Sequence, residues 1–272
     1  MSVPERSALV PDASTIASAY DGAAAEYDER LQPVGWIRRA LWRHFGQLFH
    51  AGDHVLDVGC GTGSDTLHLA SRGVRVTAVD VSPEMVQRLR AKLARASLEA
   101  RVDVHIGDIA EIVRELTGPF DGIVSSFAAL NTVDLPSFVP HAARALRPGG
   151  RLVAHLLSPG YGSRGARRWW SRAARPSAAL ANGTEINIHG RRLAHLVLPG
   201  DELYRRFFSF AFARRRAYAL GLLVGSPTDE RLPERVLDWV AQLEARVSSS
   251  EPLTSAGRFY VLDLETRRDA GR

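Results

Sequence analysis

The chain has a single cysteine, a single lysine and no long uninterrupted apolar run. One cysteine, Cys60, excludes an internal disulfide and fits a reducing compartment. No stretch approaches the ~18 consecutive apolar residues of a membrane span. The first residues lack the basic start and apolar run of a signal peptide, so we expect a cytoplasmic protein. With 272 residues and 45% hydrophobic content, the chain can bury one sizeable core plus a small lid.

Arginine carries almost all of the positive charge, because Lys92 is the only lysine. The net charge is +5 and the pI is near 9.8, with basic runs at 164–172 and 205–216. We interpret the arginine surplus as a compositional bias of the source genome and the runs as solvated faces. An anionic substrate or a membrane surface is the alternative. Nucleic acid is not the partner that we expect.

Residues 55–63 read VLDVGCGTG, an apolar strand that holds an acid and leads into three alternating glycines. Gly59, Gly61 and Gly63 let the backbone turn sharply and approach a ligand closely. Ser64 is expected to cap the helix that follows, and helix amides then face the ligand. Asp57 would repel a pyrophosphate but attract a cation, and Ser64 stands where a dinucleotide fingerprint wants a small apolar residue. The loop therefore fits a cationic adenosyl ligand better than NAD.

The segment DVGCGTG resembles the first motif of class I S-adenosylmethionine-dependent methyltransferases, and four later segments follow in that family's order. The chain is similar to bacterial small-molecule members with an insertion after the fifth strand. The resemblance implies an α/β, Rossmann-like fold, with a mostly parallel seven-stranded sheet, helices on both faces and a small cover insertion. It also implies S-adenosyl-L-methionine as the cofactor. The four segments are VTAVDVSPEMV at 76–86, IGDIAEI at 106–112, FDGIVSSFAALNTV at 120–133 and LRPGGRLVAHLL at 146–157.

Strand and helix patterns alternate strictly from residue 54 to residue 157, which predicts a parallel sheet with right-handed crossovers. Asp57, Asp80, Asp108 and Ser126 then gather at the carboxyl ends of strands, where ligands of such sheets bind. The predicted strands lie near 54–59, 75–80, 102–106, 120–126 and 151–157, and the predicted helices near 64–72, 83–97, 109–116 and 135–146.

The resemblance assigns a set of cofactor-binding residues to these motifs. Asp80 stands about 20 residues past the glycines, where an acid holds ribose hydroxyls. Tyr27 lies in an N-terminal helical segment, residues 1–50, which relatives place across the cofactor mouth with a phenol on the cofactor's carboxylate end. Cys60 is interpreted as a small spacer. The full predicted set is Tyr27, Asp57, Gly59, Cys60, Gly61, Asp80, Val81, Met85, Asp108, Ile109 and Ser126.

Helical faces are also predicted outside the central alternation. Tyr20 and Tyr27 are seven residues apart and fall on one face of a helix. The segment that follows, residues 36–49, has apolar residues near helical spacing at Ile37, Leu41, Leu48 and Phe49. Towards the C-terminus, residues 233–247 are predicted to form an amphipathic helix, whose apolar face consists of Val236, Val240, Leu243 and Val247.

The methyltransferase domain is predicted to span residues 51–272 and to contain a substrate cover at about 159–200. This insertion includes a β-hairpin with its turn near 189–191. The resemblance implies that two further strands, the last antiparallel, complete the sheet. One hypothesis is that Trp169 and Trp170 line an apolar pocket under the cover, with the nearby arginines at its rim; the alternative is that the two rings anchor the insertion on the core. That pocket would suit an amphiphilic or aromatic acceptor with an anionic group.

No catalytic residue is assigned, because the methyl group of the cofactor is already activated by its sulfonium. A general base is needed only for a hydroxyl or a protonated amine, and His155, His189 and His195 are the candidates. Asn131 follows the fourth strand, where relatives place a substrate- or methyl-facing residue. The predicted substrate-side residues are Tyr20, Asn131, His155, Trp169 and Trp170, and no metal is expected.

Methyl transfer to a small-molecule acceptor is the favoured function, with oxygen ahead of nitrogen or carbon. The fourth-strand loop reads SSFA at 125–128 and lacks the Asp/Asn-Pro-Pro-aromatic signature of amino-group nucleic-acid methyltransferases. Two alternatives stay open. One is an RNA or protein methyltransferase, motivated by the arginine surplus, and the other is a non-catalytic domain that binds the adenosyl ligand. The sequence does not determine the oligomeric state.

Overall fold

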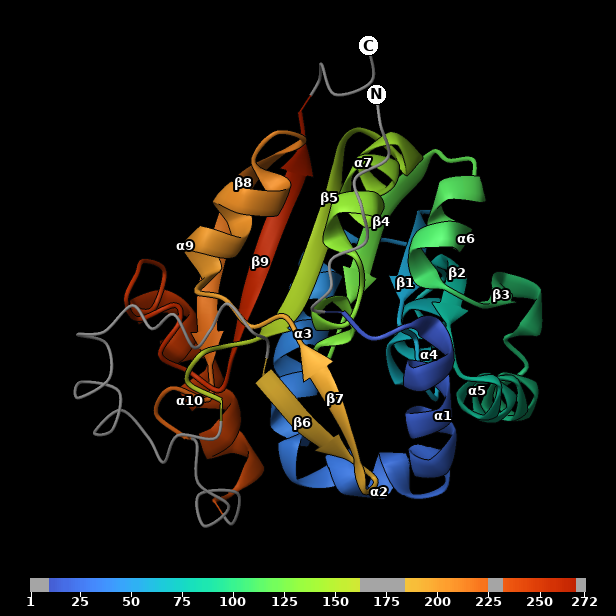
Figure 1. Cartoon of the computed structure of the whole chain (residues 1–272), viewed down its shortest axis with the longest axis horizontal. Helices are drawn as coiled ribbons and strands as arrows, with labels where there is room; N and C mark the ends of the chain where they lie inside the picture. Colours follow the sequence, from blue (N-terminus) through green and yellow to red (C-terminus); the bar gives the residue numbers. More distant parts are fainter. Residues whose placement is uncertain (1–9, 162–183, 225–231, 268–272) are drawn as a thin grey trace.

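The computed structural model describes residues 10–161, 184–224 and 232–267. In Figure 1 a seven-stranded sheet runs from β8 on the left to β3 on the right, in the order β3-β2-β1-β4-β5-β9-β8. Its strands are β1 (His54–Val58), β2 (Arg75–Asp80), β3 (Val102–Ile106), β4 (Phe120–Ser125), β5 (Leu146–Leu157), β8 (Phe212–Leu220) and β9 (Phe259–Thr266).

The sheet is mostly parallel, as the sequence predicts. β1, β2, β3, β4 and β5 pair in parallel, whereas β9 is antiparallel to both β5 and β8. The last strand therefore inserts between two strands that run the other way. Four of the predicted strands match to within one residue, but β5 begins at Leu146, five residues early, because Leu146 already pairs with Phe120.

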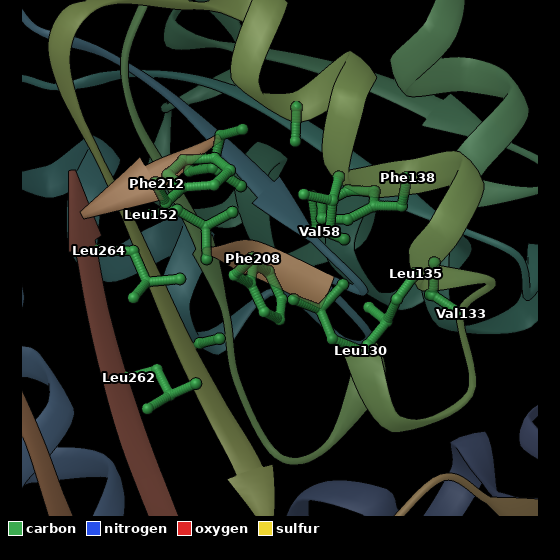
Figure 2. Packing of buried hydrophobic residues seen from close by; sticks show 14 of the residues in the cluster. Val58, Leu130, Val133, Leu135, Phe138, Leu152, Phe208, Phe212, Leu262 and Leu264 are labelled. Atoms are coloured by element: carbon green, nitrogen blue, oxygen red, sulfur yellow. The ribbon is translucent and has the colours of Figure 1, made fainter. Parts of the chain in front are cut away.

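Helices cover both faces of the sheet. One face packs against α3 (Gly35–Leu48), which buries Ile37 and Leu41 as predicted, and against α4 (Ser64–Ser71), α5 (Pro83–Ala96) and α10 (Glu234–Val247). The other packs against α6 (Ile109–Glu115), α7 (Leu135–Ala145) and α9 (Gly200–Leu203), which continues as a π-helical turn over Tyr204–Phe208. Figure 2 shows the second core, to which α7 contributes Leu135 and Phe138, the π-helical turn contributes Phe208, and the strands contribute Val58, Leu152 and Leu262.

The N-terminal segment differs from its prediction. Tyr20 lies in α1 (Ala13–Ala23) and Tyr27 begins α2 (Tyr27–Leu31), and a 3₁₀ turn over Ala24–Glu26 separates the two helices. The two phenol rings still meet edge to face, with centroids 6.3 Å apart. They do so because the chain bends between them, not because they share one helical face.

The cap of α4 is also not the predicted one. Ser64 is the first residue of the helix, and the N-cap is Gly63, which makes no side-chain capping hydrogen bond. Gly63 has φ 85°, a left-handed conformation that glycine adopts without strain. A Cβ there would lie 2.1 Å from Cδ1 of Leu89, so the close packing of α5 requires this glycine as well.

The apolar face predicted for α10 is wrong at two of its positions. Val236 and Val247 are exposed, and the helix buries Leu237, Val240, Ala241 and the carboxylate of Glu244 instead. Glu244 is fully buried and accepts hydrogen bonds from the backbone N–H groups of Gly221, Leu223 and Val224, at 2.8, 2.6 and 3.4 Å. The buried face of α10 therefore combines apolar side chains with one carboxylate, which is the acceptor for the turn after β8.

A small hairpin consists of β6 (Thr184–Ile188) and β7 (Arg191–His195), which are joined by a turn near His189, as predicted. It lies beside α1. It is the described part of the predicted cover, whereas residues 162–183, with Trp169 and Trp170, lie outside the described residues. Among the described helices, none is long and apolar enough to cross a membrane.

Removing the Glu244 carboxylate should destabilise the fold. Each buried N–H group left without an acceptor costs about 1–3 kcal/mol, so we expect Glu244→Leu to lower the free energy of unfolding by about 3–5 kcal/mol. Glu244→Gln retains one acceptor oxygen and should lose less. Urea unfolding measures both variants against Gln242→Leu, an exposed position on the same helix that should change little. A loss of under about 1 kcal/mol for Glu244→Leu would show that the turn does not depend on this carboxylate.

Candidate active site

A cavity of about 40 Å³ lies beyond the carboxyl ends of β1, β2 and β4. Loops after these strands form its floor, and α5 and α6 contribute its sides. The helices α1 and α2 form a partial roof over it through Ile16, Tyr20 and Tyr27. This volume holds only a few water molecules, since one needs roughly 10–15 Å³. The lining residues are Ile16, Tyr20, Tyr27, Gly59, Gly61, Asp80, Val81, Met85, Ile109, Ser126, Phe127, Ala129 and Thr132.

The glycine loop turns under the cavity with almost no room for side chains. Gly59 has φ 72°, and a Cβ on it would lie 2.2 Å from Cβ of Ala129. The N–H groups of Gly59 and Cys60 both donate to the carbonyl of Val79, at 2.8 and 3.1 Å. The loop is therefore bound to the end of β2, and the backbone of Gly61 is left facing the cavity.

Asp80, the last residue of β2, joins the loop to helix α5. Its Oδ2 accepts the Gly61 N–H at 2.7 Å, and its Oδ1 accepts the Ser82 N–H at 2.9 Å. Burial raises the pKa of this carboxyl, although the two N–H groups act in the opposite direction. Each oxygen has a second lone pair, so the carboxylate can accept further hydrogen bonds from a ligand in the cavity.

Two more buried carboxylates lie beneath the loop. Asp57 accepts the Thr66 hydroxyl at 2.5 Å, and burial together with the neighbouring Asp65 raises its pKa to about 7. Asp65 pairs with Arg38 at 2.9 Å and accepts Nε1 of Trp42 at 2.7 Å. Burial, the largest single influence, acts to raise the pKa of Asp65, but the Arg38 charge and the hydrogen bonds to the carboxylate together lower it. The region therefore holds more buried acid than base, which favours a cationic ligand.

The two tyrosines of the roof remain protonated. Burial raises the pKa of Tyr27 to about 12 and raises that of Tyr20 further. Both phenols are therefore hydrogen-bond donors at neutral pH. Polar contacts hold this roof to the domain: Asp21 accepts the Ser82 hydroxyl at 2.5 Å, and Asp28 pairs with Lys92 at 2.6 Å.

The loop after β4 holds a residue that sequence reasoning missed. Phe127 has φ 49° and Ala128 has φ 70°, which are strained conformations for residues with a Cβ. The Phe127 ring lines the cavity and packs under the Arg38 guanidinium, 4.4 Å from the ring centroid. The loop was recognised in the sequence, but nothing in its local pattern distinguishes Phe127 from its neighbours.

His155 supports this loop and does not line the cavity. Its Nδ1 accepts the Phe127 N–H at 3.0 Å, so its proton is on Nε2. Burial lowers the pKa of His155 to about 3. The ring packs against Phe127 and Phe259, with centroid distances of 5.2 and 4.5 Å. At neutral pH His155 is a neutral donor, which does not fit the general base considered from the sequence.

Asn131 also makes contacts that the sequence did not predict. Its side-chain N–H donates to the carbonyl of Leu196 at 2.7 Å, and its Oδ1 accepts the Leu157 N–H at 3.0 Å. The amide thus joins the β4 loop to the end of β5 and to the segment that leaves the hairpin. The structure does not bring this amide into the cavity.

Nine of the predicted residues meet at the cavity, and several do not. Asp57 and Cys60 lie below the loop, where Cys60 packs in the core as a small spacer, and burial raises the pKa of its thiol. Asp108 caps α6, accepting the N–H groups of Ala110 and Glu111 at 2.9 and 3.3 Å. The nine that line the cavity are Tyr20, Tyr27, Gly59, Gly61, Asp80, Val81, Met85, Ile109 and Ser126, and the lining residues that were missed are Ile16, Phe127, Ala129 and Thr132.

Comparisons with known proteins find similarity to methyltransferases. Residues 55–150 match the family model of a methyltransferase domain. The demethylmenaquinone methyltransferase of Tropheryma whipplei strain Twist is 34% identical over 142 residues, which cover 51% of this chain and 57% of that protein. The ubiquinone biosynthesis O-methyltransferase of Xanthomonas oryzae pv. oryzae strain PXO99A is 34% identical over 108 residues, covering 40% and 44%. The chain thus spans about half the length of the curated relatives it matches.

Solved structures extend the similarity of the fold to most of the chain. The 1,6-didemethyltoxoflavin-N1-methyltransferase of Burkholderia thailandensis superposes with a TM-score of 0.57 at 20% identity, covering 94% of this chain and 88% of that one. The [4+2]-cyclase SpnF superposes with a TM-score of 0.54 at 18% identity, covering 84% and 80%. At these identities the likeness concerns the fold alone.

Asp80→Ala should weaken binding of S-adenosylhomocysteine by about 10–100-fold, because charge-assisted hydrogen bonds contribute about 1.5–3 kcal/mol. Calorimetry measures the affinity, and far-ultraviolet circular dichroism checks the fold. Asp121→Ala is the matched control, since Asp121 also accepts a backbone N–H, that of His54, but stands at the start of β4, away from the cavity. Equal affinities for Asp80→Ala and the wild type would remove Asp80 from the ligand site.

Asp57→Asn should stabilise the ligand-free protein at high pH. The pKa of Asp57 is raised from 3.8 to about 7 by folding. The folded state therefore binds more protons than the unfolded state between about pH 4 and 7, and stability falls as the pH rises through this window. The variant lacks this penalty. Its free energy of unfolding should therefore exceed that of the wild type only slightly at about pH 4 and by about 2–4 kcal/mol at about pH 8. Urea unfolding at both pH values measures it, and an equal effect at both would contradict the shift.

Proposed function

We propose that this chain, whose residues 55–150 form a class I S-adenosylmethionine-dependent methyltransferase domain, transfers a methyl group to a small-molecule acceptor. The cavity at the carboxyl edge of β1, β2 and β4 is the observation that carries the proposal. It combines a glycine loop, a strand-end carboxylate and a surplus of buried acid. This combination suits a ligand with ribose hydroxyls at one end and positive charge at the other.

Different residues of the cavity fit different parts of the cofactor. Asp80 accepts the two ribose hydroxyls, and Ile109, Val81 and Met85 offer apolar surface to the adenine. Tyr27, a phenol that stays protonated, donates to the carboxylate end. Asp57 and Asp65 provide negative potential from below, on the side where the sulfonium would lie.

The roof has to open before this ligand can enter. The cavity is partly open to solvent, but its volume of about 40 Å³ holds only a few waters. α1 and α2 are held to the domain by side-chain contacts such as Asp21 with Ser82 and Asp28 with Lys92, in which both aspartates remain accessible to water. Such contacts exchange readily with water, so we infer that the roof lifts to admit the cofactor and closes to exclude water.

S-adenosylmethionine supplies a methyl group that its sulfonium has already activated. The chain's own residues then bind and orient the cofactor and the acceptor, and they exclude water. Aromatic rings continue from Phe127 to Phe259 and Tyr161, with centroid distances of 6.3 and 5.7 Å. An aromatic cluster beside the cavity favours an aromatic or amphiphilic acceptor over a nucleic-acid phosphate backbone.

Oxygen stands first among the acceptor atoms, with nitrogen and carbon next. The similar quinone-biosynthesis proteins include one named as an O-methyltransferase. Of the histidines considered as bases, His195 donates its Nδ1–H to the carbonyl of Leu193 at 2.9 Å, and burial lowers its pKa. His195 is therefore neutral at neutral pH and has a lone pair on Nε2 that can accept a proton. In His155 the corresponding Nε2 already carries a proton.

A transfer assay tests the proposal. The full chain is incubated with S-adenosylmethionine labelled in the methyl group and with a cell extract, and with a panel of hydroquinones, phenols and N-heterocycles. We expect label in organic-soluble small molecules, which mass spectrometry identifies. The Asp80→Ala variant should transfer at least about tenfold less label. S-adenosylhomocysteine should raise the melting temperature, and NADH should not.

The other outcomes of this assay each oppose the proposal. Label that stays in the RNA or protein fraction would indicate a macromolecular acceptor. Binding of S-adenosylhomocysteine without any transfer would indicate a non-catalytic domain, or a different reaction on the same fold. A thermal shift with NADH alone would overturn the cofactor.

A further inference from the structure

A second cavity, of about 260 Å³, lies between α3, β8 and α10 and shares no lining residue with the first. Side chains of all three elements reach it, and the described residues that line it include no Asp or Glu. Nothing in the proposed methyl transfer uses this space. Its lining residues are Ala40, Arg43, His44, Gln47, Arg216, Tyr218, Ala241, Gln242, Ala245 and Arg246.

Three guanidinium groups line this cavity, one from each element. Arg216 of β8 is held from two sides: its Nη2 donates to the carbonyl of Ala245 at 3.1 Å, and its charge lies 4.8 Å from the centroid of the Tyr218 ring. Arg246 of α10 is exposed. Within the described part of the chain, neither Arg216 nor Arg246 makes an ion pair with a carboxylate.

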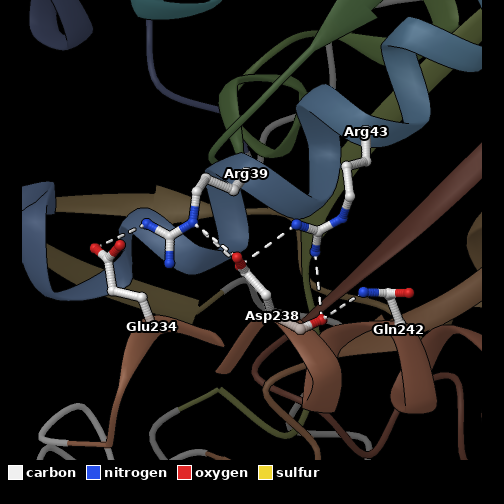
Figure 3. A network of polar contacts seen from close by, with 5 residues as sticks. All are labelled: Arg39, Arg43, Glu234, Asp238 and Gln242. Atoms are coloured by element: carbon white, nitrogen blue, oxygen red, sulfur yellow. Dashed lines mark hydrogen bonds and ion pairs between the residues drawn. The ribbon is translucent and has the colours of Figure 1, made fainter. Parts of the chain in front are cut away.

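The third guanidinium, that of Arg43, belongs to the network in Figure 3. Asp238 bridges Arg39 and Arg43 at 3.1 and 3.4 Å, and Glu234 pairs with Arg39 at 3.1 Å. Two acids thus balance two arginines at the edge of the cavity. The charges of Arg216 and Arg246 remain, so the cavity is positive overall.

Polar side chains at the floor of the cavity form hydrogen bonds with one another. Tyr218 stays protonated, because burial raises the pKa of its phenol, and its hydroxyl lies 3.3 Å from Nδ1 of His44. Nε2 of His44 is 2.9 Å from Asp263, which Arg151 also neutralises. The charge of Asp263 is therefore satisfied below the floor, and an entering ligand meets the guanidinium groups and not this carboxylate.

We propose that this cavity is a binding site for a small molecule bearing a phosphate or diphosphate group. Arginine binds such groups through paired N–H donors, and partial burial protects the attraction from salt. The volume exceeds that of single waters many times over. An occupant would contact α3, the edge strand β8 and α10 at the same time.

Calorimetry with inorganic pyrophosphate tests this site in the full chain. We expect one saturable site per chain, weakened about tenfold or more by Arg246→Gln and by Arg216→Gln. Arg235→Gln is the matched control, because it removes the same charge from an exposed position of α10 that does not line the cavity, and it should change the affinity less than about twofold. Since Arg216 also packs on Tyr218, the exposed Arg246 keeps the test valid if Arg216→Gln does not fold.

Competition with citrate distinguishes a phosphate site from a polycarboxylate site. Binding of pyrophosphate about tenfold or more tighter than citrate supports a phosphate site. Tighter binding of citrate would assign the cavity to a polycarboxylate and overturn the proposal. Absence of saturable binding, or equal losses for Arg246→Gln and Arg235→Gln, would also overturn it, because either result means only diffuse attraction to a basic surface.

Discussion

The hydrogen bonds between the Asp80 carboxylate and the backbone of Gly61 and Ser82 are the contacts on which the site depends. They join the glycine loop and the start of α5 to the end of β2. Asp80 is positioned by the sheet itself, since β2 pairs with both β1 and β3 along its length. The loop is thus held by a rigid strand, and the cavity wall has a fixed geometry before any ligand arrives. The same carboxylate faces the cavity, so one side chain both builds the wall and offers acceptors to a ligand.

This arrangement carries an electrostatic cost in the absence of a ligand. Asp57, Asp65 and Asp80 are all buried near one loop, and Arg38 pairs with Asp65 among them. The raised pKa values of Asp57 and Asp80 express that cost, which a cationic ligand would reduce. Strain at Phe127 and Ala128 adds to it. Stability given up at a binding site in this way is a common feature of functional regions.

The sequence was sufficient for the sheet and for most of the cavity. Strand and helix alternation is a local signal, and each glycine and acid of the first two motifs stands next to a strand end that this alternation predicts. Local patterns were insufficient where partners are distant in the chain. Asn131 and His155 looked like site residues because they follow or lie on strands four and five, but their hydrogen bonds go to residues 26, 28 and 65 positions away. Phe127 was missed for the same reason, since its role depends on Arg38 and Phe259.

From the order of amino acids alone one can predict the alternation of strands and helices, the glycine loop and the acid at the end of β2, because backbone preferences and hydrophobic periodicity act over a few residues. How the chain folds determines which polar groups face the cavity and which form hydrogen bonds with buried backbone groups. Glu244 illustrates the difference: α10 buries this carboxylate, which accepts hydrogen bonds from three N–H groups 20 to 23 residues before it. Burial makes an unpaired donor costly, and which donors are buried is known only once the chain has folded.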